Sequence, residues 1–251
     1  MNQRVDTHTH MSDGSFGGTG YSAAEYVAKL DEFDVMRAWI SPCSGLYANG
    51  EFRAANDELF RFCSYSPERF EPFCTVNPNY GAKKCVDELR RCSETYGCRG
   101  LKLHPWMQAF PISTRSMGDI TECCISLGMT LFFHDGTPPY ASTLQIANLA
   151  ERCPEATVVL GHAGLIENYN SAIRSLKRLP NLYASMTGPS IFQLQKMVDS
   201  VSANKLMIGT DFGFARNTSA LEYRLQMWDH VHTSEETREW IDHKTAFTLM
   251  P

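Results

Sequence analysis

The sequence predicts an α/β fold, a single (β/α)8 TIM barrel with an extra helix at the C-terminus. Eight short apolar runs, typical of buried parallel strands, alternate with segments of helical length. The chain has 251 residues, a usual size for one barrel domain. The glycines after the first run lack the G-x-G-x-x-G spacing of an open doubly wound sheet, the main alternative fold. Residues 1–251 are therefore expected to form one domain.

Each predicted strand is a run of mainly apolar residues bounded by turn signals. In chain order the strands are expected at residues 5–10, 35–41, 70–76, 99–104, 129–134, 156–162, 181–186 and 206–211. A segment of helical length follows each strand. This regular alternation implies parallel strands joined by right-handed crossovers.

The segments between the strands carry apolar residues at helical spacing on one face and charged residues on the other. Helices are expected at residues 21–33, 51–63, 82–96, 114–127, 140–152, 166–177, 191–201 and, beyond the last strand, 235–249. Ser22 can cap the first helix. The Ser66-Pro67 pair marks the end of the segment that contains the second helix.

Composition narrows the class of protein. With 43% hydrophobic and 20% charged residues, the chain resembles an ordinary globular protein. A formal net charge of −5 and scattered Lys and Arg argue against nucleic acid as a partner. No apolar run has the roughly 18 residues of a membrane span, and no secretory signal opens the chain, so we expect a cytoplasmic protein. The nine cysteines show no C-x-x-C pairing and are expected to be free thiols.

His8 and His10 lie two residues apart in the first strand, so both imidazoles point to the same side. Two converging imidazoles make half of a metal site, although an ordinary pair of strand histidines is at least as common. More polar residues stand at or near the ends of later strands: His104, His134, His162 and Asp211. Catalytic groups of (β/α)8 barrels gather at the carboxyl ends of the strands, so this distribution favours an active site.

Four short sequence motifs contain these residues, and they follow one another along the chain: GLKLHP, LFFHDG, VVLGHAG and MIGTDFGF. Together with the His-x-His of the first strand, they resemble the amidohydrolase superfamily. Within it, the chain is most similar to the amidohydrolase-2, or amidohydrolase-related, family of small decarboxylases and hydrolases. The resemblance extends from the first strand to the eighth.

The resemblance implies a divalent metal held by His8, His10, His134 and Asp211. Zn²⁺ is the first expectation, with Mn²⁺ or Fe²⁺ as alternatives. His162 would act beside it as an acid, a base or a group that polarises the substrate. A catalytic zinc lowers the pKa of a bound water to about 7, and Asp211 could then accept the proton of that water.

Lys102 admits two interpretations. Strand alternation points it into the barrel, where an unpaired ammonium is costly. In binuclear relatives, a carboxylated lysine on this strand bridges two metals, and Lys102 and His162 would then hold a second ion. In mononuclear relatives the lysine is a positive charge for a substrate carboxylate, and we favour this interpretation. His104 is expected either to contact the substrate or to orient another group, and Trp106 to line the substrate.

We therefore expect a metal-dependent hydrolase that uses a metal-activated water on a small carboxylated or cyclic substrate, such as a lactone, amide or ester. A metal-dependent non-oxidative decarboxylase is the second expectation, and a catalytically inactive barrel that binds a ligand is the third. The expected partner is a small molecule, with neither nucleic acid nor membrane, and a homodimer is compatible with the sequence.

Overall fold

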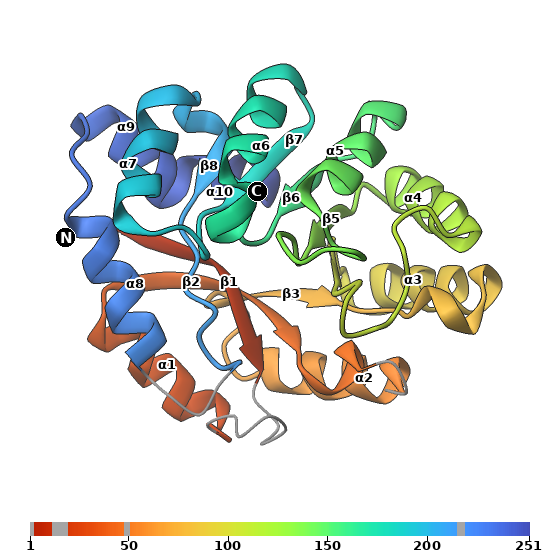
Figure 1. Ribbon diagram of the computed structural model, residues 1–251. Helices are drawn as coiled ribbons and strands as arrows, with labels where there is room; N and C mark the ends of the chain where they lie inside the picture. The colour runs from red at the N-terminus through yellow and green to blue at the C-terminus, as the bar shows by residue number, and fades with distance from the viewer. Residues whose placement is uncertain (1–2, 12–19, 48–50, 215–218) are drawn as a thin grey trace.

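Eight parallel strands form a nearly closed barrel in the computed structural model, which describes residues 3–11, 20–47, 51–214 and 219–251 (Figure 1). The strands are β1 Arg4–Met11, β2 Val35–Pro42, β3 Phe70–Cys74, β4 Gly100–Leu103, β5 Thr130–Phe133, β6 Val158–Leu160, β7 Leu182–Ser185 and β8 Leu206–Met207. Each strand pairs with the next along the chain. The predicted TIM barrel is thus confirmed.

The segment after β8 closes the barrel against β1. The backbone N–H of Thr7 donates to Ile208 O at 3.0 Å, and the N–H of Asp211 donates to His8 O at 2.8 Å. The N–H of His10 donates to Phe212 O, also at 2.8 Å. This closure brings the His8-x-His10 pair of β1 close to Asp211.

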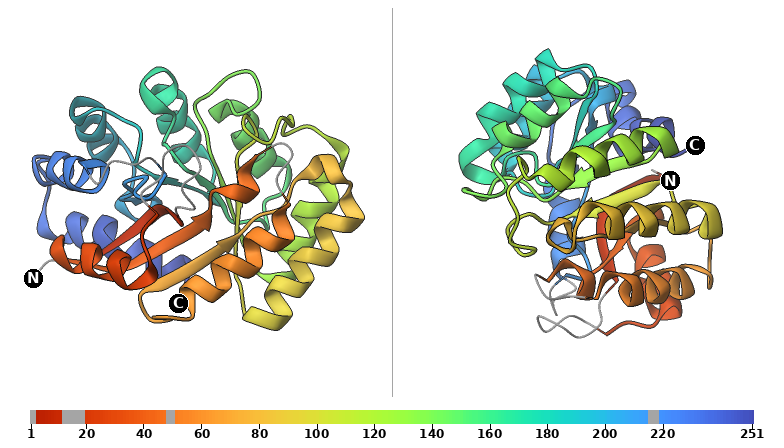
Figure 2. Two further views of the ribbon diagram at one scale, coloured as in Figure 1. Left: turned by 90° about the horizontal axis from the view of Figure 1, so that it is seen from below. Right: turned by 90° about the vertical axis from the view of Figure 1, so that its right-hand side faces the viewer.

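The helices lie outside the strands, as Figures 1 and 2 show from three directions. They are α1 Ala23–Glu32, α2 Phe52–Cys63, α3 Ala82–Tyr96, α4 Arg115–Leu127, α5 Thr143–Arg152, α6 Leu165–Arg178, α7 Ile191–Ser200 and α8 Ser219–Asp229. Ser22 caps α1 in a capping box with Glu25, as predicted. The fifth helix begins three residues later than predicted because Ser142 caps it in the same way.

The predicted C-terminal helix is a continuous helical segment with three parts, α9 Glu235–Glu239, a π-helical stretch Trp240–Lys244 and α10 Thr245–Leu249. Ala246 and Met250 from its end pack into an inner core together with side chains from several strands. The other members of this core are Val5, Trp39, Phe73, Phe132, Val159 and Met207. The Phe132 ring of this core lies 4.9 Å from the ring of His8, so the inner core borders the histidine pair of β1.

A larger outer core joins the strands to the surrounding helices, with Leu101, Leu103, Leu131 and Leu160 among its members. All nine cysteines are free thiols, as predicted. Among the described helices, none has the length and apolar character needed to cross a membrane.

Candidate active site

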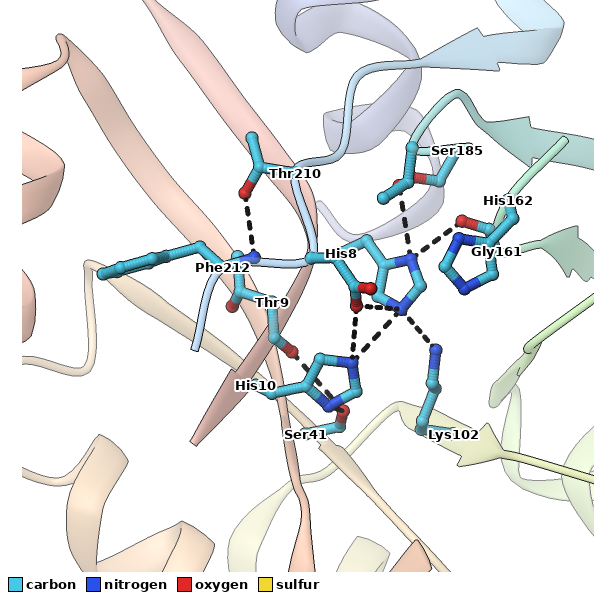
Figure 3. Close-up of polar contacts among 12 residues, drawn as sticks. His8, Thr9, His10, Ser41, Lys102, Gly161, His162, Ser185, Thr210 and Phe212 are labelled. Carbon is cyan, nitrogen blue, oxygen red and sulfur yellow. Dashed lines mark hydrogen bonds and ion pairs between the residues drawn. The ribbon is translucent and has the colours of Figure 1, made fainter. Parts of the chain in front are cut away.

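The two histidines of β1 converge with Asp211 at one point. Nε2 of His10 lies 3.3 Å from Nε2 of His8 (Figure 3). Oδ1 of Asp211 lies 3.1 Å from Nε2 of His10 and 3.5 Å from Nε2 of His8. Both histidines are buried, whereas the side chain of Asp211 is 31% exposed. The cluster is therefore buried on the side of the histidines and open to solvent on the side of Asp211.

His162, two residues beyond β6, completes this cluster. Its ring centroid lies 4.7 Å from that of His8. His8, His162 and Asp211 each offer one ligand atom, and these atoms all lie within 4.8 Å of one another. The three residues come from β1 and from the segments that follow β6 and β8, so the closed barrel brings them together.

His134 and His104 form a second pair of imidazoles beside the first. Their rings stack with centroids 3.7 Å apart, and the His134 ring lies 4.5 Å from that of His162. Nε2 of His134 is 3.0 Å from the hydroxyl of Thr137. The structure thus places His162, rather than His134, within ligand distance of His8 and Asp211. The assignment of His134 as a metal ligand stays a prediction.

Lys102 points into the barrel, as strand alternation predicted. Its Nζ lies 2.6 Å from Nε2 of His8 and 4.5 Å from the centre of the Phe132 ring. Only 2% of the residue is exposed. Burial lowers the pKa of Lys102 to about 7, although Asp211 acts in the opposite direction. This amine therefore gives up its proton more readily than an ordinary lysine does.

Burial sets the charge of the imidazoles. It lowers the pKa of His8, His10 and His134 below the usual range, and it lowers the pKa of His162 to about 4. Burial alone would raise the pKa of Asp211, but the neighbouring His8 and the hydrogen bond from His10 hold it well below its ordinary value. The site therefore combines neutral imidazoles with an ionised carboxylate.

Hydrogen bonds fix which nitrogen each histidine presents. Nδ1 of His8 lies 2.8 Å from the carbonyl oxygen of Gly161, so Nδ1 carries the proton and Nε2 offers a lone pair to the cluster. Nδ1 of His10 lies 3.1 Å from the hydroxyl of Ser41. Such partners hold imidazoles in the orientation that a metal ligand needs.

Two buried carboxylates that the sequence analysis missed support the backbone of the site. Asp135 accepts hydrogen bonds from the backbone N–H of His162 at 2.7 Å and from that of Gly164 at 2.8 Å. Asp6 accepts from the N–H of His8 at 3.2 Å and from the hydroxyl of Thr210 at 2.5 Å. Burial raises the pKa of Asp6 to about 7 and of Asp135 to about 6. Asp6 was detectable, since it lies two residues before His8 in the same strand.

The backbone near the site is strained. Asp211 has a φ of 65°, and Ala163 and Leu165, which follow His162, both have a φ of 50°. Residues with side chains rarely adopt this left-handed region, and such conformations concentrate at functional sites.

The remaining candidate, Trp106, lies in the loop after β4 with 55% of its surface exposed, where a substrate can reach it.

The donor set fits a divalent metal. Neutral imidazole nitrogens and a carboxylate oxygen are the ligands that Zn²⁺, Mn²⁺ and Fe²⁺ share. The His8, His162 and Asp211 atoms are already close together, and His10 adjoins two of them. The exposed face of Asp211 leaves room for a water or substrate.

Comparisons with known proteins identify the family of the chain and relate its fold to solved structures. Residues 5–249 match the amidohydrolase family of the amidohydrolase-2 type, whereas no curated protein sequence matches the chain. A solved 2,6-dihydroxybenzoate decarboxylase, complexed with 2,6-dihydroxybenzoate, is similar over 99% of both chains, with 15% identity and a TM-score of 0.79.

Two further solved structures have the same fold. A dihydroxybenzoic acid decarboxylase from a Polaromonas species, with bound manganese and the inhibitor 2-nitroresorcinol, is 17% identical with a TM-score of 0.76, over 99% of this chain and 97% of that one. A probable 2-pyrone-4,6-dicarboxylic acid hydrolase from Acinetobacter baumannii, with citric acid bound, is 16% identical with a TM-score of 0.72, over 99% of both chains. The family match across almost the whole sequence, on a barrel that gathers His8, His10, His162 and Asp211, shows that this chain belongs to the amidohydrolase-2 family.

Proposed function

We propose that this protein is a divalent-metal-dependent hydrolase of small carboxylated or cyclic molecules, such as a lactone, amide or ester. The observation that carries the proposal is the meeting of His8, His162 and Asp211 at the carboxyl ends of three strands. Family membership supports a metal-dependent enzyme, and the sequence resemblance supports His10 and His134 as further ligands.

One ion per chain is the proposed metal content. Zn²⁺ suits the donor set, and the manganese of the Polaromonas decarboxylase makes Mn²⁺ the first alternative. When bound, the metal would polarise the substrate and make a water molecule more acidic. The alternative is a site with two metal ions, which requires that Lys102 is carboxylated and bridges them.

The protein side chains would divide the remaining work. Asp211, ionised and partly exposed, is placed to accept a proton from the attacking water and to pass it to the leaving group. His162 is neutral and would stabilise the charge that develops on the substrate oxygen by donating a hydrogen bond. Lys102, deep in the barrel, would attract an anionic substrate when protonated.

Decarboxylation is the second proposal, and the dihydroxybenzoate decarboxylases among the similar structures favour it. In that reaction the bond to the carboxylate carbon breaks, CO₂ leaves, and the electron pair on the ring carbon takes up a proton. Lys102, with a pKa of about 7, would donate this proton in its protonated form, whereas His162 or Asp211 would first have to take up a proton.

The two reactions can be separated in ¹⁸O-labelled water. Metal-loaded protein is incubated with 2-pyrone-4,6-dicarboxylate and with 2,6-dihydroxybenzoate as test substrates, with Asp211→Asn as the inactive control. Hydrolysis places one ¹⁸O in the product, whereas decarboxylation releases CO₂ and leaves the organic product unlabelled. If the wild type turns over neither compound and Asp211→Asn binds them equally well, a ligand-binding barrel replaces both proposals.

A further inference from the structure

A cavity of about 380 Å³ lies at the amino ends of β2, β3 and β4, next to the C-terminal ends of α2 and α3 (Figure 1). Its lining includes three charged side chains, Arg37, Glu71 and Arg99, and the aromatic rings of Phe60, Phe70 and Tyr96. The volume is within the range of ligand pockets, roughly 300–1,000 Å³. Since the candidate active site lies at the carboxyl ends of the parallel strands, this cavity is at the opposite end of the barrel.

The charged side chains of the cavity comprise two guanidinium groups and one carboxylate. Nη2 of Arg37 donates to Oε2 of Glu71 at 2.6 Å, and Nη2 of Arg99 lies 3.9 Å from the same oxygen. Among the residues that the structure describes, no other side-chain carboxylate lies within 4.0 Å of either arginine. One guanidinium balances the charge of Glu71, so the three side chains together have one positive charge in excess.

Both arginines have N–H groups that the described part of the chain does not use. Arg37 forms its hydrogen bond through Nη2, and its Nε is buried without an acceptor. Arg99 also donates through Nη2, to the main-chain oxygen of Pro251 at 2.8 Å, and its side chain is 37% exposed. A guanidinium has five N–H donors in a fixed fork that matches a carboxylate. Each arginine therefore has donors left for an anion.

Aromatic rings form the apolar part of the lining. The rings of Phe60 and Tyr96 stack with centroids 4.0 Å apart and planes 14° from parallel, which joins the end of α2 to the end of α3. Phe60 and Phe70 are buried, whereas Tyr96 is 43% exposed. Aromatic side chains beside guanidinium groups suit a ligand that has an aromatic ring and one anionic end.

We propose that this cavity binds a small aromatic carboxylate. The carboxylate of the ligand accepts hydrogen bonds from Arg37 and Arg99, and its ring lies beside Phe60 and Tyr96. The amino end of a (β/α)8 barrel ordinarily serves stability, and the pair of Arg37 with Glu71 fits that role. Stability alone needs neither the second guanidinium nor the space beside it. The inference is independent of the proposed function, since the cavity contains none of the residues assigned to the reaction.

Crystals soaked with 4-bromobenzoate test the location, because the anomalous scattering of bromine marks the ligand. We expect a bromine in the cavity of the wild type, and a lower occupancy there in Arg99→Gln crystals soaked at the same concentration. A bromine found only at the candidate active site, or at no site on the protein, overturns the inference.

Calorimetry tests the chemistry in solution with 4-bromobenzoate and the neutral 4-bromobenzamide. Arg99→Gln should bind the benzoate about tenfold more weakly, because a charged hydrogen bond is lost, while its affinity for the amide stays within twofold of the wild type. Tyr96→Leu should weaken both ligands, since it keeps the charges and removes an aromatic ring. The matched control is Arg61→Gln, which changes an exposed arginine of α2 outside the cavity and should keep both affinities.

A purely structural role for Arg99 predicts a different pattern. If Arg99 only holds the C-terminal segment through Pro251, Arg99→Gln should lower the melting temperature and leave the ratio of the two affinities unchanged. Arg99→Lys keeps the charge and should retain part of the preference for the benzoate. An unchanged ratio in Arg99→Gln, or a wild type that binds the benzoate and the amide equally well, overturns the proposed carboxylate site.

Discussion

Nζ of Lys102 lies 2.6 Å from Nε2 of His8, the nitrogen that also faces His10 and Asp211. Nδ1 of His8 is engaged by the carbonyl oxygen of Gly161, so Nε2 is the nitrogen with a free lone pair. A metal ligated by His8 needs the same lone pair. Lys102 and a metal ion therefore compete for one atom.

Replacing Lys102 by Met should consequently strengthen metal binding. The substitution removes both the competing hydrogen bond and a positive charge, and we expect a gain of about tenfold in affinity for Zn²⁺ or Mn²⁺. Competition with a chromogenic chelator measures the affinity, and elemental analysis measures the content. One ion per chain is expected in both proteins. Two ions in the wild type and one in Lys102→Met would instead support a carboxylated lysine that bridges two metals.

Gly209 is a position beside His8 where the barrel leaves no space for a side chain. A Cβ at Gly209 would collide with the hydroxyls of Ser185 and Thr187 and would lie 2.8 Å from Cβ of His8. Gly209→Ala should therefore destabilise the fold by about 1–3 kcal/mol and weaken metal binding, because His8 must shift. Urea unfolding and chelator competition measure the two effects.

The matched control for this change is Gly118→Ala in α4, where a Cβ meets no atom within 4 Å. Alanine favours a helix over glycine by about 0.5–1 kcal/mol, so this variant should be more stable than the wild type with unchanged metal affinity. Equal behaviour of the two variants would show that the close approach at Gly209 has no consequence.

Asp242 should make the stability fall as pH rises. Its carboxylate accepts a hydrogen bond from Nε1 of Trp228 at 2.6 Å, and burial raises its pKa above the ordinary 3.8. The folded protein then holds this proton more tightly than the unfolded chain. The stabilisation is complete below pH 3.8 and disappears as pH rises through the raised pKa.

Asp242→Asn keeps a hydrogen-bond acceptor for Trp228 but cannot titrate. The stability of the wild type relative to this variant should therefore decrease as the pH rises above 3.8, as measured by urea unfolding at several pH values. A difference that is constant or increases with pH would be incompatible with a raised pKa for Asp242.

Sequence periodicity predicted the barrel because its strands are apolar on both faces and its helices on one. Strand alternation correctly pointed Lys102 inward. His10 lies near the end of β1, whereas β6 and β8 are shorter than predicted, so His162 and Asp211 lie two and four residues beyond them. The sequence around His134 does not reveal that its ring stacks on that of His104. This contact depends on the conformations of the loops that follow β4 and β5.

Partners distant in sequence also escaped prediction. Asp135 receives hydrogen bonds from His162 and Gly164, more than 25 residues further on, and nothing local indicates such an acceptor. The π-helical stretch Trp240–Lys244 divides the C-terminal helix, although its residues are as compatible with an α-helix as their neighbours. Both features arise from tertiary packing and leave no periodic signal.

Metal content tests the account most directly. Protein purified without chelator is analysed for zinc, manganese and iron. The wild type is compared with His8→Ala, with Asp211→Asn and with His230→Ala, which changes an exposed histidine just after α8. We predict about one divalent ion per chain in the wild type and in His230→Ala. In His8→Ala and Asp211→Asn we expect the metal content per chain to be at least tenfold lower. A wild type that binds no divalent metal, or variants at His8 and Asp211 that retain it fully, would contradict the proposed metal centre.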